Sequence, residues 1–554
     1  MSEAPDDRSP DTEPLPPPGH AFRGDPLLGG WLRRAIPTAR LPEVAGQLDE
    51  LGGLASGELY ALQRADRDNE PVLRRRDGGD SDLWEVAEAP LWREAERIAA
   101  RFGLVATAYE GEPHRHARLE QFAKVYLFHP SSDVYTCPLA MTDGAARALL
   151  DSGQKILIER VLPHLTSRDP GQFWTCGQWM AEATSARPTR AVFEGGRWRL
   201  HGRKCYASAV SSQVALVLAH PVGAAGPSPA LYYLALRDAE GRPNGVRVDR
   251  LMDNLGTRKV PTAQLTLDGA VAELVCEPAG AHATVDSMHA IMRTWGSVCA
   301  VASMRRGLAL ARSYAAGRQV LGQSLSSLPL HRDTLAGLEA ETWGAFLMAF
   351  QLVELTGCGE RGEFDAEQRA LLRLLAPLTK LVTGRQAVVT VTEILECFGG
   401  AGYAEDTGLP ALLRDTHVLP IWGGTTNVLA LEALQSRDLP LALAALMGRA
   451  SACVRGVSEP RLAGAARQAV GAIERAALWL ESGQDPLLAQ AGARRLALTL
   501  ARALQLALLC EHAQWLLDHA RDARGLAAAL RYARAPVDLM HDFDPALERE
   551  LLGD

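Results

Sequence analysis

The spacing of apolar and polar residues predicts helices on either side of one stretch of short strands. Between residues 21 and 172 apolar residues recur at helical spacing, as in "SDLWEVAEAPLWREAERIAARFGLVA". An amphipathic helix carries an apolar residue at every third or fourth position, so this segment is expected to be helical. Its helically spaced apolar residues are Trp84, Val86, Ala89, Leu91, Ile98 and Ala99.

A second helix is predicted in "CPLAMTDGAARALLDSG". Thr142 and Asp143 stand just before an apolar run, where a side-chain oxygen can accept hydrogen bonds from the free N–H groups of a first turn. Gly153 closes the run, and glycine is favoured just after a helix because it adopts the left-handed conformation freely. The helix is therefore expected to begin at Thr142–Asp143 and to end before Gly153.

From residue 173 an alternating pattern replaces the helical one. The stretch "RAVFEGGRWRLHGRKCYASAVSSQVALVLAHP" alternates around a Gly-Gly pair, which predicts a hairpin that turns at Gly195–Gly196. The runs "PALYYLALRD", "NGVRVDRLM" and "AQLTLDGAVAELV" are separated by Gly, Pro, Asn and Asp. Residues 173–282 are therefore expected to form a small all-β domain.

Helical spacing returns after residue 283. The stretch "RTWGSVCAVASMRRGLALARSYAAGRQVLG" predicts one long helix whose small residues allow close packing. A second long helix is predicted to stop at Gly399–Gly400. The segment 436–554, rich in Ala, Leu and Arg, is also predicted to be helical. Its apolar stretch near Leu496–Cys510 contains Arg502 and is too short to span a bilayer, so a buried helix is expected.

The predicted fold class is α+β, because the strands are gathered in one part of the chain and the helices in the others. This order is unlike the regular alternation of strands and helices in a Rossmann fold, and no GxGxxG motif follows a predicted strand. The predicted parts are a disordered leader at 1–20, an N-terminal helical domain at 21–172, a middle β domain at 173–282, a second helical domain at 283–435 and a C-terminal helical domain at 436–554.

Composition narrows the class of function. The chain has 554 residues, of which 47% are hydrophobic and 22% charged, as in globular proteins. Its net charge of −8 gives no general attraction to nucleic acid or to anionic lipid. The nine cysteines show no zinc-ligand spacing, so no metal site is expected, and reduced thiols in the cytoplasm are predicted. The acidic, Pro-rich start of the sequence is unlike a signal peptide.

Seven motifs are each weak evidence alone, but together and in this order they are specific: "CPLAMTDGAARALL", "GQWMAEA", "LHGRKCYAS", "LMDNLGTRKVPTAQLTLDGA", "GRQVLGQSL", "ECFGGAGYAEDTGLPALLRD" and "PIWGGTTNVL". With them the sequence resembles the acyl-CoA dehydrogenase superfamily, in particular its AidB-like branch, which carries an extra C-terminal helical domain. The resemblance implies a β-barrel-like middle domain, a four-helix second helical domain and assembly as a homodimer or homotetramer.

The resemblance also implies a reaction and its base. Family members bind FAD and oxidise the α,β bond of an acyl thioester, with a glutamate that removes the α-proton directly after an aromatic residue. Here that aromatic residue is Trp422, and Gly423 follows it. The other family position for the base, on the first long helix of the second helical domain, holds Met292. No catalytic residue is therefore predicted, and the remaining weak candidates are Glu182 and Glu396.

The resemblance assigns FAD as the cofactor and ten residues of its site. These residues are Met180, Glu182, Tyr206, Ser208, Arg318, Gly399, Gly400, Trp422, Thr425 and Asn427. The β-domain half departs from the family pattern, because Ala181 replaces a threonine and the Gly-rich Ser-Asp loop is shortened. Arg318 is expected to reach the FAD of a neighbouring subunit, with Leu321 in place of an aromatic residue.

Three functional hypotheses stay open. The first is an acyl-CoA dehydrogenase-like flavoprotein oxidoreductase that is catalytically eroded because Gly423 replaces the base. The second is an FAD-poor or FAD-free pseudoenzyme that serves as a structural subunit beside an active paralogue or does non-redox chemistry in the same pocket. The third is an AidB-like protein that protects nucleic acid. Equal numbers of arginine and acidic residues in 436–554 count against it, because phosphate binding needs a surface of one sign.

Overall fold

The computed structural model describes residues 17–76, 83–111, 116–182, 187–223, 228–238, 240–362, 364–483, 485–541 and 545–553. Tertiary contacts divide the chain into two compact units. The helical unit comprises Met1–Pro37, Ala300–Leu352 and Phe364–Asp554. The barrel unit comprises Thr38–Cys299 and Val353–Glu363. The five-part division stays a prediction, and most of the predicted leader lies outside the described residues.

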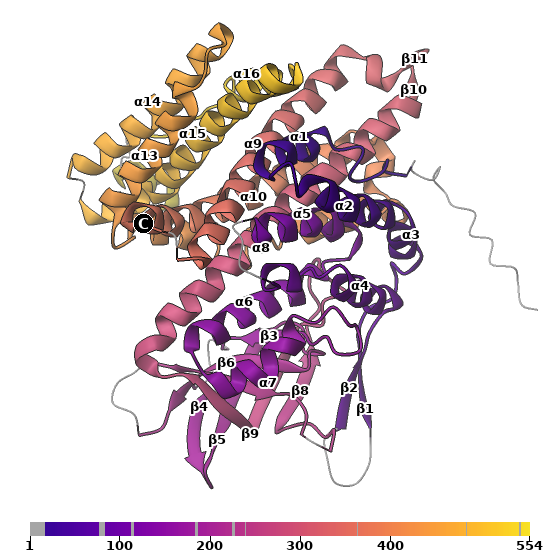
Figure 1. Cartoon of the computed structure of the whole chain (residues 1–554), viewed down its shortest axis with the longest axis vertical. Helices are drawn as coiled ribbons and strands as arrows, with labels where there is room; N and C mark the ends of the chain where they lie inside the picture. Colours follow the sequence, from indigo (N-terminus) through magenta and orange to yellow (C-terminus); the bar gives the residue numbers. More distant parts are fainter. Residues whose placement is uncertain are drawn as a thin grey trace, which may run out of the picture. The chain divides into compact units, whose positions relative to one another are not determined.

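The barrel unit contains a seven-stranded sheet that closes on itself (Figure 1). Its strands are β3 (Cys176–Trp179), β4 (Arg190–Glu194), β5 (Arg197–Ala207), β6 (Val214–Pro221), β7 (Ala230–Ala235), β8 (Val246–Leu251) and β9 (Ala263–Cys276). The order is β3-β6-β4-β5-β9-β7, β8 pairs with β9, and β6 also pairs with β7. The predicted hairpin is confirmed, because β4 and β5 are antiparallel and Phe193 lies opposite Trp198. Its turn residues Gly195 and Gly196 both have positive φ.

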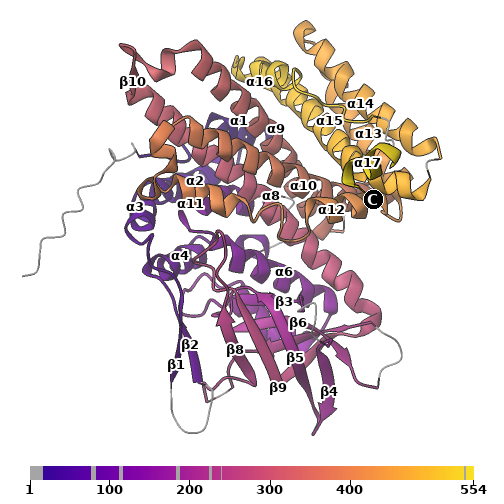
Figure 2. The same ribbon diagram turned by 180° about the vertical axis from the view of Figure 1, so that it is seen from behind.

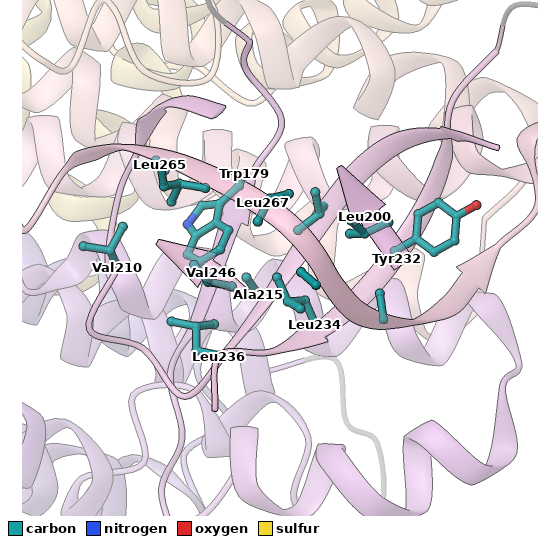
Figure 3. Packing of buried hydrophobic residues seen from close by; sticks show 14 of the residues in the cluster. Trp179, Leu200, Val210, Ala215, Tyr232, Leu234, Leu236, Val246, Leu265 and Leu267 are labelled. Atoms are coloured by element: carbon teal, nitrogen blue, oxygen red, sulfur yellow. The ribbon is translucent and has the colours of Figure 1, made fainter. Parts of the chain in front are cut away.

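The inward-facing residues of these strands form the core of the barrel (Figure 3). Along β9, side chains alternate between buried and more exposed positions, as the alternating sequence predicts. Trp179 is only 1% exposed, and its indole N–H donates to the carbonyl of Ser208 at 3.2 Å. This bond ties the end of β3 to the segment that follows β5.

Helices and one hairpin complete the barrel unit. They are α2 (Leu41–Ser56), α3 (Glu58–Ala65), β1 (Val72–Arg76), β2 (Leu83–Ala87), α4 (Pro90–Arg101), η1 (Ala106–Ala108), α5 (Ala117–Phe128), η2 (His129–Ser131), α6 (Thr136–Ser152) and α7 (Lys155–Leu165). One apolar cluster joins Leu149 of α6 and Val161 of α7 to Leu216 and Leu231 of the sheet. Helices α6 and α7 therefore cover part of the sheet.

The prediction that Trp84 and Val86 lie on a helix is wrong. Both belong to β2, where Trp84 and Val86 are buried and Glu85 between them is exposed, a period of two. Helix α4 begins only at Pro90, because proline holds the preceding Ala89 in an extended conformation and suits the first helical position. The later apolar residues of the pattern do lie on α4.

The predicted start of the next helix is also wrong. Helix α6 begins at Thr136, six residues before Thr142, because Pro138 falls in the first turn, where a missing N–H costs nothing. Thr142 lies inside the helix and donates to the carbonyl of Pro138 at 2.7 Å. The predicted end is confirmed, since Gly153 follows the helix with φ +67°.

The helical unit contains the remaining elements (Figure 2). They are α1 (Pro26–Ala35), β10 (Gln319–Val320), β11 (Gln323–Ser324), η3 (Leu325–Ser327), α10 (Ala366–Glu396), η4 (Gly399–Tyr403), η5 (Glu405–Thr407), α11 (Leu409–Thr416), α12 (Thr426–Leu434), α13 (Leu439–Arg455), η6 (Pro460–Leu462), α14 (Ala463–Glu481), α15 (Pro486–Ala520), α16 (Arg524–Tyr532) and α17 (Pro545–Leu552). Two long helices, α8 (Pro278–Gly317) and α9 (Pro329–Glu360), have residues in both units.

Small residues allow the close packing that the sequence predicts. A β-carbon at Gly307 of α8 would lie 2.6 Å from Cδ1 of Ile394 on α10, so only glycine fits there without a shift.

Helix α15 is longer than the predicted stretch near Leu496–Cys510. It is the one helix of the described residues that is long and apolar enough to cross a membrane, but 83% of its apolar window is buried within the protein.

Candidate functional site

The turn between α11 and α12 holds the residues expected to face a ligand in the helical unit. Trp422 is half-buried, and its backbone N–H donates to the carbonyl of Val418 at 3.0 Å. Gly423 and Gly424 have φ values of +67° and +115°, a region that glycine adopts without a steric penalty. A β-carbon at Gly424 would lie 2.9 Å from Leu429. The turn thus presents backbone, with no side chain, at position 423.

Two residues of α10, one helical turn apart, hold the backbone of this turn. The side chain of Lys380 is buried, and its ammonium donates to the carbonyl of Gly424. A β-carbon at Gly384 would lie 3.2 Å from the backbone of Leu419 and Pro420, so glycine admits the segment closely. Lys380 was not predicted as a site residue; its only signal in the sequence is that it is a single lysine within the apolar stretch "LLAPLTKLVTG".

The first turn of α12 can accept an anion. Thr425 is the N-cap residue with an extended backbone, and its side chain makes no capping hydrogen bond. Both Thr425 and Asn427 are exposed. The free N–H groups and the partial positive charge of a helix N-terminus favour a group such as a diphosphate. Thr425 and Asn427 therefore suit the role of FAD-binding residues that the family resemblance implies for them.

The other predicted residues of the helical unit lie at its surface. Gly399, with φ +59°, and Gly400 are exposed in η4, directly after the end of α10. Arg318 is exposed after α8, where its backbone N–H donates to Tyr314 at 2.9 Å. Leu321, near it, is 92% exposed and has φ +51°.

In the barrel unit Tyr206 stands out by its conformation and exposure. Its φ is +55°, at an irregularity of β5, and its side chain is 65% exposed. A left-handed conformation costs a non-glycine residue roughly 1–2 kcal/mol, and such strain is concentrated at functional sites. Ser208, two residues on, is buried with its Oγ 3.1 Å from Oγ1 of Thr262. An exposed aromatic ring held in this way suits stacking against a flat ligand.

Glu182 has a structural role in the barrel unit. Its Oε1 accepts hydrogen bonds from Nζ of Lys204 at 3.0 Å and from the N–H of Thr189 at 2.8 Å. Burial favours a higher pKa, but these two donors lower the pKa of Glu182 below its ordinary value. Met180, just before it, is half-buried. The shortened loop falls in residues 183–186, outside the described residues, so its effect stays a prediction.

The barrel unit contains a buried charged cluster around Asp143 and Arg118 that was not predicted from the sequence. The Asp143 carboxylate is fully buried and accepts from Arg118 at 2.7 Å, from Tyr109 at 2.6 Å and from Trp295 at 2.7 Å. Arg118 also pairs with Glu360 at 2.6 Å. Burial raises the pKa of the Tyr109 hydroxyl well above its ordinary value. Asp143 is thus held by several donors and is not a free proton acceptor.

Each unit, taken by itself, holds one described feature of a kind that FAD binding uses. Tyr206 offers an exposed ring, and the first turn of α12 offers anion-binding N–H groups. The candidates for a base fit less well. Position 292 is a half-buried methionine of α8, and Glu396 is exposed at the end of α10.

Two families match the sequence. The acyl-CoA dehydrogenase C-terminal domain matches residues 283–436, and the N-terminal domain of the adaptive response protein AidB matches residues 16–170. Acyl-CoA dehydrogenase family member 11 of Caenorhabditis elegans is 39% identical over 431 residues, 75% of this chain and 70% of its own length. Putative acyl-CoA dehydrogenase AidB of Escherichia coli is 27% identical over 417 residues, 73% of this chain and 76% of its own length.

The fold agrees with these matches. The solved structure of Caenorhabditis elegans ACDH-11 in complex with C11-CoA superposes with a TM-score of 0.91 at 34% identity. The superposition covers 100% of this chain and 98% of that one. The predicted α+β fold class, with helical domains and a small β region, is therefore confirmed.

Proposed function

Because the chain belongs to the acyl-CoA dehydrogenase superfamily, in its AidB-like branch, we propose that it is a flavoprotein that binds an acyl thioester but has eroded dehydrogenation activity. One observation carries the proposal: the residue after Trp422 is Gly423. Its backbone is left-handed and offers no carboxylate.

The residues of this chain have definite roles in binding under this proposal. FAD, when bound, supplies the acceptor for a hydride. Tyr206 provides an exposed ring that stacks on it, whereas Ser208, two residues on, is buried and its hydroxyl is bonded to Thr262. Thr425 and Asn427 provide the helix N-terminus for its diphosphate.

The proton step is the one that the chain no longer supports. Removal of an α-proton needs a base held within hydrogen-bond reach of it. Gly423 has no side chain, and next to it the Lys380 ammonium donates to the carbonyl of Gly424. An ammonium is already protonated and cannot accept the proton. Glu182 is held by Lys204 and Thr189, so a bound thioester keeps its α-proton.

The ligand proposal draws on a relative. ACDH-11 was solved in complex with C11-CoA, which supports an acyl-CoA thioester as the ligand of this chain. Purified protein should therefore be tested with undecanoyl-CoA. We expect a visible flavin absorption band, saturable thioester binding and no bleaching of the flavin on mixing. Rapid bleaching would contradict the loss of the proton acceptor.

A second candidate function is an FAD-free pseudoenzyme. It is favoured by Ala181, which replaces the family threonine, and by the commitment of Glu182 to Lys204. The absorption spectrum separates the two candidates, because a colourless protein that stays colourless after incubation with FAD supports the second.

A further inference from the structure

Two arginines of the helical unit lie on packed helices and form what we call the arginine pair. Arg385 belongs to α10 and is half-buried, and Arg494 belongs to α15 and is exposed. The two helices are joined next to Arg385, where the side-chain amides of Gln386 and Gln505 exchange hydrogen bonds at 3.1 and 2.9 Å. Neither arginine is among the residues expected to contact FAD.

The arginine pair has no acidic partner within the described part of the chain. Neither guanidinium takes part in a hydrogen bond or an ion pair with any residue that the structure describes. Burial lowers the pKa of Arg385 below its ordinary value, and the charge of the nearby Arg494 lowers it further. No described carboxylate opposes this shift. Two positive charges therefore repel each other, and one of them is partly removed from water, which costs free energy until an anion compensates it.

Two other arginines at helix contacts of the same unit are compensated by the protein itself. Arg502 on α15 pairs with Glu341 on α9 at 2.9 Å. Arg449 on α13 pairs with Glu511 on α15, also at 2.9 Å. In both cases the neighbouring helix places a carboxylate opposite the partly buried guanidinium. The arginine pair differs because the neighbouring helix places a second positive charge there, as a site for an external anion requires.

A phosphate group matches the charge and the donors of the arginine pair. A guanidinium presents N–H donors in a planar fork that fits two oxygens of a phosphate. A phosphate dianion can neutralise both positive charges, whereas a monocarboxylate neutralises one of them. A cationic ligand would add to the repulsion, and an apolar ligand would leave it in place. The chemistry of the arginine pair therefore selects a dianion with several oxygen acceptors.

We propose that Arg385 and Arg494 form a binding site for a phosphate group, carried either by free orthophosphate or by a small phosphate monoester. The phosphate lies between the two guanidinium groups and accepts hydrogen bonds from both. Bound phosphate links α10 to α15 and removes the repulsion between the two charges. The site uses none of the residues that we propose to bind FAD, so it does not rest on the proposed function.

Titration calorimetry on the full chain, at an ionic strength held constant with sodium chloride, tests this site. Orthophosphate and glycerol 3-phosphate are the probes for the two sources of the phosphate group, and acetate is the monoanion for comparison. We expect saturable 1:1 binding of at least one phosphate probe, and binding of acetate that is weaker by roughly tenfold or more. Arg385→Met and Arg494→Met should each weaken phosphate binding by roughly tenfold. Arg467→Met, at an exposed position of α14, is the control and should leave binding unchanged.

Urea unfolding separates a binding role from a merely structural one. In phosphate-free buffer Arg385→Met should raise the urea midpoint, because it removes a partly buried charge and its repulsion with Arg494. Added phosphate should raise the midpoint of the wild type and leave that of Arg385→Met unchanged, because a ligand stabilises only the fold that binds it. A lower midpoint of Arg385→Met in phosphate-free buffer would show that the arginine is already compensated within the protein and would count against the site.

Three calorimetric results would overturn the proposal. They are the absence of saturable binding of both phosphate probes at millimolar concentration, equal binding of phosphate and acetate, and unchanged phosphate binding in both methionine variants. Circular dichroism establishes that each variant is folded. The comparison of phosphate with acetate needs no variant, so it decides the matter even if both variants misfold.

Discussion

The ammonium of Lys380 on α10 donates a hydrogen bond to the carbonyl of Gly424, in the turn that carries Gly423. The lysine is 3% exposed, so its charge lies buried behind the backbone that we propose faces a thioester. Gly384, one helical turn on, lets the preceding Leu419–Pro420 backbone approach α10. Helix α10 therefore sets the position of the turn by contacts with the backbone of the turn. These contacts do not depend on a side chain at position 423.

Replacing Lys380 with methionine should loosen this turn. Methionine fills similar space but donates no hydrogen bond, and a buried carbonyl left without its donor costs about 1–3 kcal/mol. We expect a loss of stability of that size in urea unfolding and several-fold weaker binding of undecanoyl-CoA in calorimetry. Lys155→Met, at an exposed position of α7, is the control. Unchanged thioester affinity in a folded Lys380→Met variant would show that this contact does not position the ligand site.

The Asp143 cluster makes a prediction about stability alone. Asp143→Asn removes one of the two carboxylates that pair with the fully buried Arg118; because Glu360 still pairs with it, we expect a cost of about 3 kcal/mol, the lower end of the range for a broken buried ion pair. Asp151→Asn, which breaks the more exposed pair with Arg147, should cost less than about 1 kcal/mol. Urea unfolding of both variants measures the difference. Equal effects would mean that the buried pair contributes no more than a surface pair.

His512 predicts a dependence of stability on pH. The side chain is 1% exposed, and neither ring nitrogen has a hydrogen-bond partner among the residues that the structure describes. Burial, together with Arg34, lowers the pKa of His512 to about 3, although Glu511 and Asp522 oppose this shift. Between about pH 6.5 and that value the unfolded chain binds a proton that the folded chain does not, so acid destabilises the fold.

The variant His512→Leu should remove this acid sensitivity. Relative to wild type it should gain about 2 kcal/mol of unfolding free energy on going from pH 7 to pH 5. Urea midpoints at the two pH values provide the measurement. His282→Gln, at a side chain that is 89% exposed, is the control and should not change the dependence. An identical pH dependence in wild type and His512→Leu would contradict the assigned burial of a neutral ring.

Local patterns predicted those elements whose signal lies in adjacent residues. The Gly195–Gly196 turn and the alternation of β5 and β9 specify the hairpin and the strands of the barrel. Trp84 and Val86 were misassigned because the helical spacing of the residues that follow was extended back over them, although positions two apart lie on opposite faces of a helix and share a face only in a strand. The pairing of β2 with β1, a contact between separate segments, shows the strand directly.

The residues of the candidate site were predicted from the sequence, but the side chains that hold them in place were not. Motif resemblance located Tyr206 and the turn at Gly423, but it could not show that Glu182 is held by Lys204, because that contact joins β5 to a segment 22 positions earlier in the sequence. The same holds for Lys380 and Gly424, which are 44 positions apart. Buried polar contacts between distant segments produce no repeating pattern among neighbouring residues, so they cannot be predicted from the spacing of residues in the sequence.

The variant Gly423→Glu tests the central claim most directly. A glutamate at this position must accept φ +67°, a cost of roughly 1–2 kcal/mol that a folded chain can bear. FAD-loaded wild type and variant are mixed with undecanoyl-CoA and an artificial electron acceptor, and acceptor reduction is followed. We predict turnover in Gly423→Glu and none above background in wild type. Vigorous turnover by the wild-type chain would contradict the account, because another group would then be removing the α-proton.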